Sequence, residues 1–211
     1  MSARAELLLA VRTALGPAVE APEVPRDYRA AGSGAAAGSA ELVDRFCERV
    51  ADYKAKVHRV AEPDGLPEAL AAACAERGSR RVVRAAAADW AIPGMEPAVD
   101  SVGLGPTDLD HVDAALTGCA LAIAETGTIV LDGGPLSGRR ALTLVPDHHI
   151  CVVRADQVVA SVPDAIAALA DAARAASPLT FVSGPSATSD IELKRVEGVH
   201  GPRKLDVVLV G

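Results

Sequence analysis

The feature that most constrains the fold is the alternation of apolar runs with one amphipathic segment between residues 56 and 85. The runs at 56–61 and 80–85 have the length and valine content of strands. The segment 64–78 between them carries apolar side chains at helical spacing and ends at a glycine. A strand, a helix and a second strand in this order are typical of parallel strands joined by a crossover helix. The sequence therefore predicts a parallel sheet covered by helices.

The pattern changes after residue 118. Apolar runs at 119–134, 140–146 and 149–160 follow one another without room for crossover helices, and we expect an antiparallel or mixed section of the same sheet. The other predicted elements are a helix that begins at Ser39 and extends to about residue 53, a weak strand at 100–103, a short polar helix near 106–116, a helix at 162–175 and strands at 178–183 and 205–210. The predicted fold class is α/β, a three-layer α/β/α sandwich with a Rossmann-like mixed sheet.

The N-terminal residues 1–38 differ from the rest. Residues 2–15 place leucines and a valine on one helical stripe, and residues 16–38 are rich in Pro, Gly, Ala and Ser without periodicity. We expect an N-terminal helix and a flexible connector over 1–38, followed by a single domain over 39–211. The apolar run at 7–11 is shorter than a secretory signal needs, and no run reaches the ~18 apolar residues of a membrane span. These features predict a cytoplasmic protein without a membrane segment.

The composition limits partners and cofactors. A formal charge of −7 with a pI near 5.2 argues against a nucleic-acid surface, which needs clustered Lys and Arg. The four cysteines (47, 74, 119 and 151) are far apart, whereas zinc and iron–sulfur sites need grouped thiolates. We therefore expect buried reduced thiols, and no metal or cofactor bound by this chain.

The segment "SGPSATSDIE" (183–192) places hydroxyls, carboxylates, a glycine and a proline at the end of a predicted strand. Ligands of α/β sheets bind beyond the carboxyl ends of the strands, and free N–H groups at a helix start suit a carboxylate or a phosphate. The alternative is that residues 189–192 form a capping box. The candidate ligand-binding residues are Gly184, Ser186, Thr188, Ser189, Asp190 and Glu192.

Two turns contain the candidate catalytic residues. In "AETGTIVL" (124–131), Glu125 suits a nucleophile, a base or a turn-former, and Thr126 and Thr128 add hydroxyls for ligand binding. In "GVHGP" (198–202), His200 lies between two glycines, where it suits either a base or a surface turn.

Arginine and histidine pairs add further candidates. "LSGRR" (136–140) offers Arg139 or Arg140 as the partner of a ligand carboxylate, and we select Arg139. The adjacent histidines of "DHHI" (147–150) point to opposite faces of a strand, so at most one serves a given site, and we select His149. A metal site built from His149, His200, Asp190 and Glu192 has no recognised ligand spacing, so none is predicted.

Four motifs, taken in order, resemble the lactate utilization protein C family, whose members are single-domain proteins of the LUD-domain group. They are "IAETGTIVL", "VPDHHICVV", "GPSATSDIELKRVEGVHGP" and the closing "LDVVLVG". The resemblance implies a fold of the NagB/RpiA/CoA-transferase-like type. It also implies a role in a three-component cytoplasmic system that oxidises L-lactate to pyruvate, in which the other two components carry the iron–sulfur clusters.

Three functions stay open on these grounds. The first is a non-redox subunit of the lactate-oxidising system that associates with the iron–sulfur proteins and binds a small carboxylate or phosphate-bearing ligand. The second is a stand-alone enzyme for phosphate, nucleotide or coenzyme A, and the third is a non-catalytic assembly module. For a ligand site we expect the turns at 125, 139, 186 and 200 to converge on one pocket.

Overall fold

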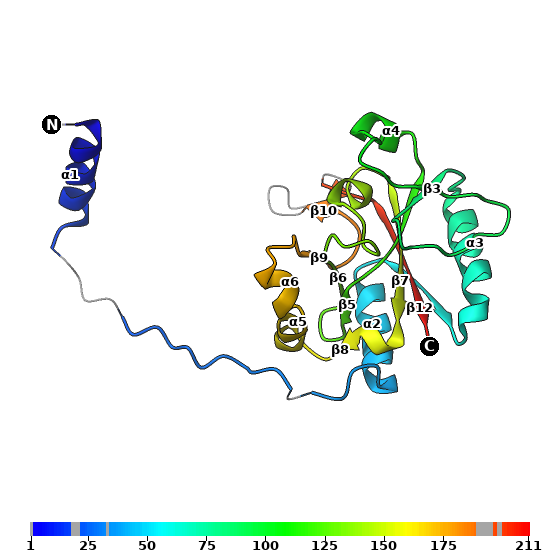
Figure 1. Ribbon diagram of the computed structural model, residues 1–211. Coiled ribbons are helices and arrows are strands. Elements are labelled where there is room, and N and C mark those ends of the chain that lie inside the picture. Colours follow the sequence, from blue (N-terminus) through cyan, green and yellow to red (C-terminus); the bar gives the residue numbers. More distant parts are fainter. Residues whose placement is uncertain (1, 18–21, 33, 189–195, 198–199) are drawn as a thin grey trace.

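The structure, a computed structural model, describes residues 2–17, 22–32, 34–188, 196–197 and 200–211 (Figure 1). Its centre is a large sheet of six strands that are parallel to one another in every pairing. In spatial order these are β1 (Lys56–Val60), β12 (Lys204–Val210), β7 (His148–Arg154), β4 (Ala114–Gly118), β2 (Val82–Arg84) and β3 (Ala98–Val99). The predicted parallel sheet is confirmed.

Strand β4 was not predicted, because the sequence favoured a helix up to residue 116. The helix α4 (Pro106–Asp110) ends earlier, and "AALTG" forms a fully buried strand between β2 and β7. Small residues such as Ala and Gly have low strand propensity. Here they allow the layers on both faces to approach the sheet, and that packing decides the conformation.

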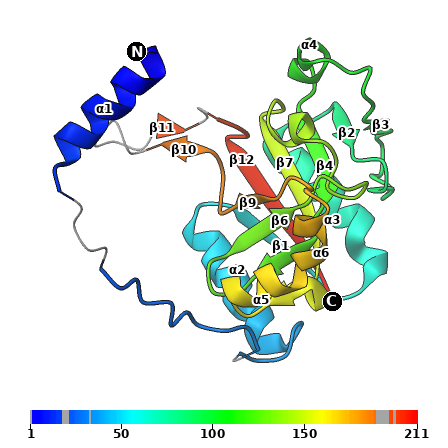
Figure 2. The ribbon, with the colours of Figure 1, turned by 60° about the vertical axis from the view of Figure 1, so that its left-hand side comes forward.

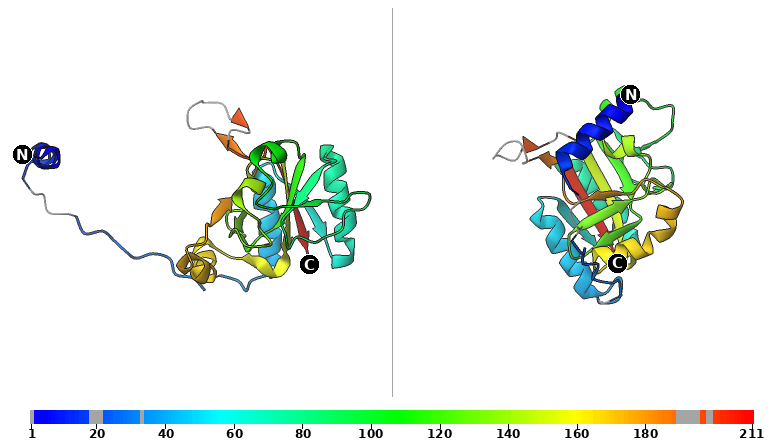
Figure 3. Two further views of the ribbon diagram at one scale, coloured as in Figure 1. Left: turned by 45° about the horizontal axis from the view of Figure 1, so that its top comes forward. Right: turned by 90° about the vertical axis from the view of Figure 1, so that its left-hand side faces the viewer.

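Helices cover both faces of the large sheet, which gives the predicted three layers (left view of Figure 3). On one face α3 (Leu66–Arg77) packs Leu70 and Cys74 against β4, β7 and β12, and Gly78 ends the helix in a left-handed conformation. On the other face α2 (Ala40–Asp52) packs Phe46 and Val50 against β7 and β12. The α/β class and the three-layer architecture are thus confirmed.

The antiparallel section forms a second sheet and does not extend the first, contrary to our expectation. Its strands, in order, are β8 (Val158–Val159), β5 (Leu121–Ile123), β6 (Thr128–Leu131) and β9 (Thr180–Val182). One side of this small sheet packs beside α2 on the large sheet through Ala122, Ile129 and Leu131. Its other side is covered by α5 (Val162–Ala168), which is followed by α6 (Ala170–Arg174). Both sides of the small sheet are apolar because each faces another layer.

The run 140–146, predicted as a strand, contains the 3₁₀ turn η2 (Arg140–Thr143). This turn buries Leu142 against Val83 and Ala115 on the face of the large sheet. The remaining short elements are η1 (Pro63–Gly65), η3 (Ala155–Gln157) and the pair β10 (Ala187–Thr188) and β11 (Val196–Glu197). Turn η2 matters for function because it carries two polar residues into the space beside β7.

The N-terminal helix α1 (Ala3–Leu15) is present as predicted, contains no buried residue and lies apart from the sheets (Figures 1 and 2). Part of the connector is held on the domain: Gly32 N donates to Asp164 Oδ1 at 2.6 Å, and Gly38 N donates to Val158 O at 3.0 Å. Within the described part of the chain, no helix has the length and apolar character needed to cross a bilayer.

Candidate functional site

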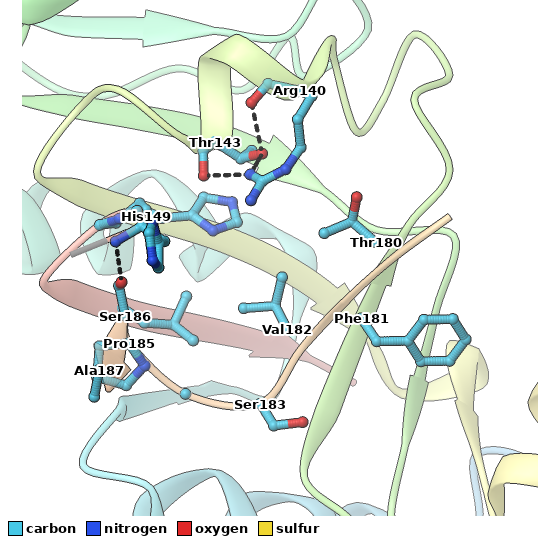
Figure 4. Close-up of a pocket in the computed structure, with 15 residues that line it drawn as sticks. Arg140, Thr143, His149, Thr180, Phe181, Val182, Ser183, Pro185, Ser186 and Ala187 are labelled. Atoms are coloured by element: carbon cyan, nitrogen blue, oxygen red, sulfur yellow. Dashed lines mark hydrogen bonds between the residues drawn. The ribbon is translucent and has the colours of Figure 1, made fainter. Parts of the chain in front are cut away.

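A cavity of about 230 Å³ lies between the edge strand β9 of the small sheet and the beginnings of β7 and β12 in the large sheet (Figure 4). From the large sheet it is lined by His149, the second residue of β7, and by Leu205, the second residue of β12. Turn η2 adds Arg140 and Thr143. The other lining residues are Thr180, Phe181, Val182, Ser183, Gly184, Pro185, Ser186, Ala187, His200, Gly201 and Pro202.

This cavity adjoins the amino ends of the parallel strands, whereas we expected a site beyond their carboxyl ends. The segment that begins with "SGPS" does follow a strand, as predicted, but that strand is β9 of the small sheet. The chain then runs to the start of β12, where Ser186 N donates to Pro202 O at 2.8 Å. The rule about carboxyl ends applies to the parallel sheet, and the polar segment belongs to the other sheet.

Arg140 brings a positively charged side chain to the wall of the cavity. Its Nη1 donates to Thr143 O at 2.8 Å and to Thr143 Oγ1 at 3.0 Å, both uncharged acceptors. Over the described ranges, no carboxylate pairs with this guanidinium. Figure 4 shows the guanidinium of Arg140 and the ring of His149 turned toward the same space, while Phe181 points away from it. A guanidinium has five N–H donors, so donors remain for an anionic ligand.

His149 is a buried, neutral partner in this cavity. Its side chain is almost wholly buried, and its Nε2 lies 2.8 Å from Thr117 Oγ1 on β4. Burial, followed by the charges of His148 and Arg140, lowers the pKa of His149 from 6.5 to about 3. The imidazole is therefore neutral near pH 7, with one nitrogen as donor and the other as acceptor. A neutral ring beside a guanidinium that has no carboxylate partner among the described residues suits a ligand that carries both a carboxylate and a hydroxyl or keto oxygen.

The loops that close the cavity are held by their own hydrogen bonds. His200 N donates to Ser186 Oγ at 3.1 Å, a bond drawn in Figure 4. Gly184 has φ 87°, and a Cβ at this position would lie 2.6 Å from Cβ of Tyr53. The glycine that we expected to admit a ligand is thus also required by packing of the loop against the end of α2.

Glu125 and Arg139 do not line this cavity. Glu125 forms a two-bond ion pair with Arg29 of the connector at 2.6 and 2.9 Å, and this bonding lowers the pKa of the Glu125 carboxyl. Arg139 donates to the largely buried carboxylate of Asp100 at 2.7 and 2.8 Å and also to Leu104 O. Each of the two predicted site residues has its charge met by a partner within the chain.

The two threonines of the Glu125 turn are connected to the cavity indirectly. Thr126 Oγ1 lies 2.7 Å from Thr128 Oγ1, which lies 2.6 Å from Ser183 Oγ at the cavity wall. Thr188 belongs to β10, and the predicted residues Ser189, Asp190 and Glu192 lie outside the described residues. Of the predicted site residues, the structure therefore brings His149, Gly184, Ser186 and His200 together around one cavity.

The sequence interpretation did not name Thr143, Val182 or Leu205, which line the cavity. Of the two arginines that it considered, Arg140 lines the cavity and the selected Arg139 does not. A Thr three residues after an Arg was an available signal, because in a helical turn these side chains meet. The part of the chain that the structure describes contains no group of three or more His, Cys, Asp or Glu residues that suits a metal ion.

The parallel sheet, the flanking helices and the cavity beside them define a Rossmann-like α/β protein with a small polar pocket. The LUD domain profile matches residues 43–210, and the chain belongs to the LUD domain family. A lactate utilization protein C from Deinococcus radiodurans is 51% identical over 174 residues, which cover 82% of this chain and 81% of that protein. An uncharacterized protein from Neisseria meningitidis is 29% identical over 225 residues, which cover 100% of this chain and 94% of that protein.

A solved structure supports the same fold. The crystal structure of a DUF162 family protein from Deinococcus radiodurans superposes with a TM-score of 0.70 and 44% sequence identity. The superposition covers 82% of this chain and 98% of that chain.

Proposed function

We propose that the protein is a component of a cytoplasmic lactate utilization system in which the cavity at β7 and β12 binds a small carboxylate, with L-lactate and pyruvate as the first candidates. The family and the names of its relatives support the lactate role. In this proposal the iron–sulfur proteins of the system carry the electrons, and this chain associates with them and supplies a binding site.

The observation that carries the proposal is the state of Arg140. A guanidinium forms two parallel hydrogen bonds with a carboxylate, which makes arginine well suited to this ligand class. Arg140 is oriented by Thr143 and has donors left over on the cavity side. His149 then faces a second oxygen of the ligand, and Val182 and Leu205 provide an apolar wall for a short carbon chain.

The cysteines support a role without a redox centre in this chain. Burial, followed by the charge of Asp206, raises the pKa of Cys74 to about 11, and burial also raises the pKa of Cys47. Iron–sulfur clusters are held by thiolates, and these environments disfavour the thiolate form. This is consistent with electron transfer on partner proteins.

Isothermal titration of the full chain with sodium L-lactate and sodium pyruvate tests the proposal. We expect binding of one or both, and an affinity at least about tenfold lower for Arg140→Gln because one partner of a charge-assisted pair is removed. Arg139→Gln is the matched control, since it is the neighbouring arginine and already pairs with Asp100. No binding of either acid, or equal affinity in Arg140→Gln and wild type, would overturn the carboxylate site.

Phosphate, ATP and coenzyme A in the same titration test the competing functions. Binding of these compounds alone favours the stand-alone enzyme, for which Glu125 would have to leave Arg29 before acting as a nucleophile. Absence of binding by every compound favours the assembly module.

A further inference from the structure

A buried charged cluster lies directly behind the cavity, on the α3 face of the large sheet. Its centre is Asp206 of β12, which is 0% exposed. Arg77 at the end of α3 donates to Asp206 Oδ1 through Nη2 at 2.8 Å and through Nε at 3.2 Å. Nε2 of His148 and Nε2 of His58 lie 3.3 and 3.6 Å from Oδ2. Three elements, α3, β7 and β1, thus converge on one carboxylate.

The cluster has the properties of a tightly constrained unit. The Nε2 atoms of His58 and His148 are buried without a hydrogen-bond partner in the described part of the chain, so Asp206 is the group that compensates them. His148 Nδ1 lies 2.9 Å from Ser79 Oγ, which fixes the ring from its other side. A buried carboxylate costs several kcal/mol unless its partners are well placed, so movement of His148 is opposed by the whole cluster.

His148 and His149 are consecutive residues of β7 and therefore point to opposite faces of the sheet. His148 enters the cluster, and His149 enters the cavity, where it is bonded to Thr117. The first two residues of β7 are therefore both fixed by side-chain contacts, His148 on the α3 face of the sheet and His149 on the cavity face. Because the two residues share a peptide bond, a shift of the backbone at His148 would also move the backbone that carries His149.

We propose that His148 and Asp206, oriented by Ser79 and Arg77, form a positioning pair that holds the start of β7 and thereby keeps the ring of His149 on Thr117, whose hydrogen bond in turn favours one tautomer. Neither residue touches the cavity, so neither is a catalytic residue. The significance of this pair for ligand binding rests on the proposed carboxylate site, whereas the pair itself can be tested without any ligand.

A Ser, a His and an Asp in series also occur in hydrolases, where the serine must reach a substrate. Ser79 is only 4% exposed and lies with Asp206 on the face covered by α3. Ser79, His148 and Asp206 are therefore too deeply buried to reach a substrate, and in our proposal they position the neighbouring residue His149.

The test is nitrogen-15 NMR of the histidine rings in the ligand-free full chain, with His148→Gln and Ser79→Ala as the main variants. We expect wild-type His149 to show a single neutral tautomer, and each variant to move its ring signals toward exchange between the two tautomers. His58→Gln is the matched control, because His58 faces the same oxygen of Asp206 but its strand neighbours do not line the cavity. Unchanged His149 signals in His148→Gln, or an equal change in His58→Gln, would overturn the positioning pair.

Ligand binding provides the second measurement, on the same variants. With sodium pyruvate or sodium L-lactate as the probe, whichever the wild type binds, we expect His148→Gln to bind about tenfold more weakly, the size of coupling found within one network. A His148→Gln protein that melts at a lower temperature but keeps both the His149 signals and the affinity would show a purely structural role and overturn the proposal. The proposed function fails separately, through the titration of Arg140→Gln.

Discussion

On the α3 side of the large sheet, Asp206 is met by Arg77, His58 and His148. On the cavity side, the partners of Arg140 among the described residues are the uncharged oxygens of Thr143. The two sites lie at the start of the same strands, and consecutive residues of β7 serve one each. In the buried cluster, the charge of Asp206 is compensated by residues of the protein itself. In the cavity, the guanidinium of Arg140 keeps N–H donors that can bind a ligand. The difference separates groups that hold the fold from groups that are free to hold a ligand.

The largest expected effect comes from removing the carboxylate at the centre of the cluster. Asp206→Asn leaves Arg77 and the two histidines without their anion, and breaking a buried ion pair on one side costs about 3–5 kcal/mol. Urea denaturation measures this loss in the free energy of unfolding. Glu76→Gln is the control, because its pair with Lys56 is exposed and worth less than about 1 kcal/mol. Similar losses in both variants would contradict the view that the buried carboxylate of Asp206 matters more for stability than the exposed carboxylate of Glu76.

A pH titration of stability tests the neutral state of His149. Its pKa is lowered from 6.5 to about 3 on folding, so between these values the unfolded chain binds a proton that the native protein does not. Stability from this residue is complete above pH 6.5 and is lost as pH falls toward 3, by up to roughly 4 kcal/mol. The low pKa of Asp206 adds a further loss below about pH 4.

The matched variant for the pH titration is His149→Gln, measured by urea denaturation at intervals between pH 7 and pH 4. We expect its free energy of unfolding to vary less with pH than that of the wild type. A slope identical to that of the wild type would mean that the pKa of His149 is the same in the folded and the unfolded protein, so that burial does not keep the ring neutral.

Arg139→Gln tests how much the ion pair between Arg139 and Asp100 contributes to stability. Asp100 is 7% exposed and would lose its charge-assisted hydrogen bonds, at a cost of about 2 kcal/mol in the free energy of unfolding. Arg140→Gln should change this free energy by less, since it removes bonds to neutral oxygens near the surface. Denaturation of the two variants side by side checks the order, and the reverse order would undermine the assignment of Arg140 to the ligand.

The smallest expected effect on stability is at the Glu125 turn. Its pair with Arg29 is solvent-exposed, so Glu125→Gln should leave the midpoint of urea unfolding unchanged. The connector, however, loses an anchor, and we expect faster trypsin cleavage after Arg29. Slower or unchanged cleavage would show that the hydrogen bonds of Gly32 and Gly38 hold the connector without this ion pair.

The sequence predicted the layers of the fold well because apolar periodicity reports directly on burial. It failed at β4, where "AALTG" carries small side chains whose strand conformation depends on the layers around them. It also placed the antiparallel strands in the large sheet, since pairing partners depend on packing that periodicity does not contain.

The site was less predictable for a related reason. Whether Arg139 or Arg140 faces a ligand depends on the 3₁₀ turn that directs them, and on Asp100, which is distant in the sequence. The buried cluster did leave a signal: Asp206 stands alone among the aliphatic residues of "LDVVLV", and a charge in a buried strand requires a partner. That signal identifies the need for a partner but not Arg77 or His148.

Whether Arg140 binds the ligand carboxylate is best tested by a crystal structure of the full chain grown with sodium pyruvate or sodium L-lactate. We predict the ligand carboxylate within hydrogen-bond distance of the Arg140 guanidinium, with its second oxygen toward the ring of His149. A carboxylate bound instead beside Arg139, or at the Glu125 turn after displacement of Arg29, would contradict the assignment of the cavity as the binding site.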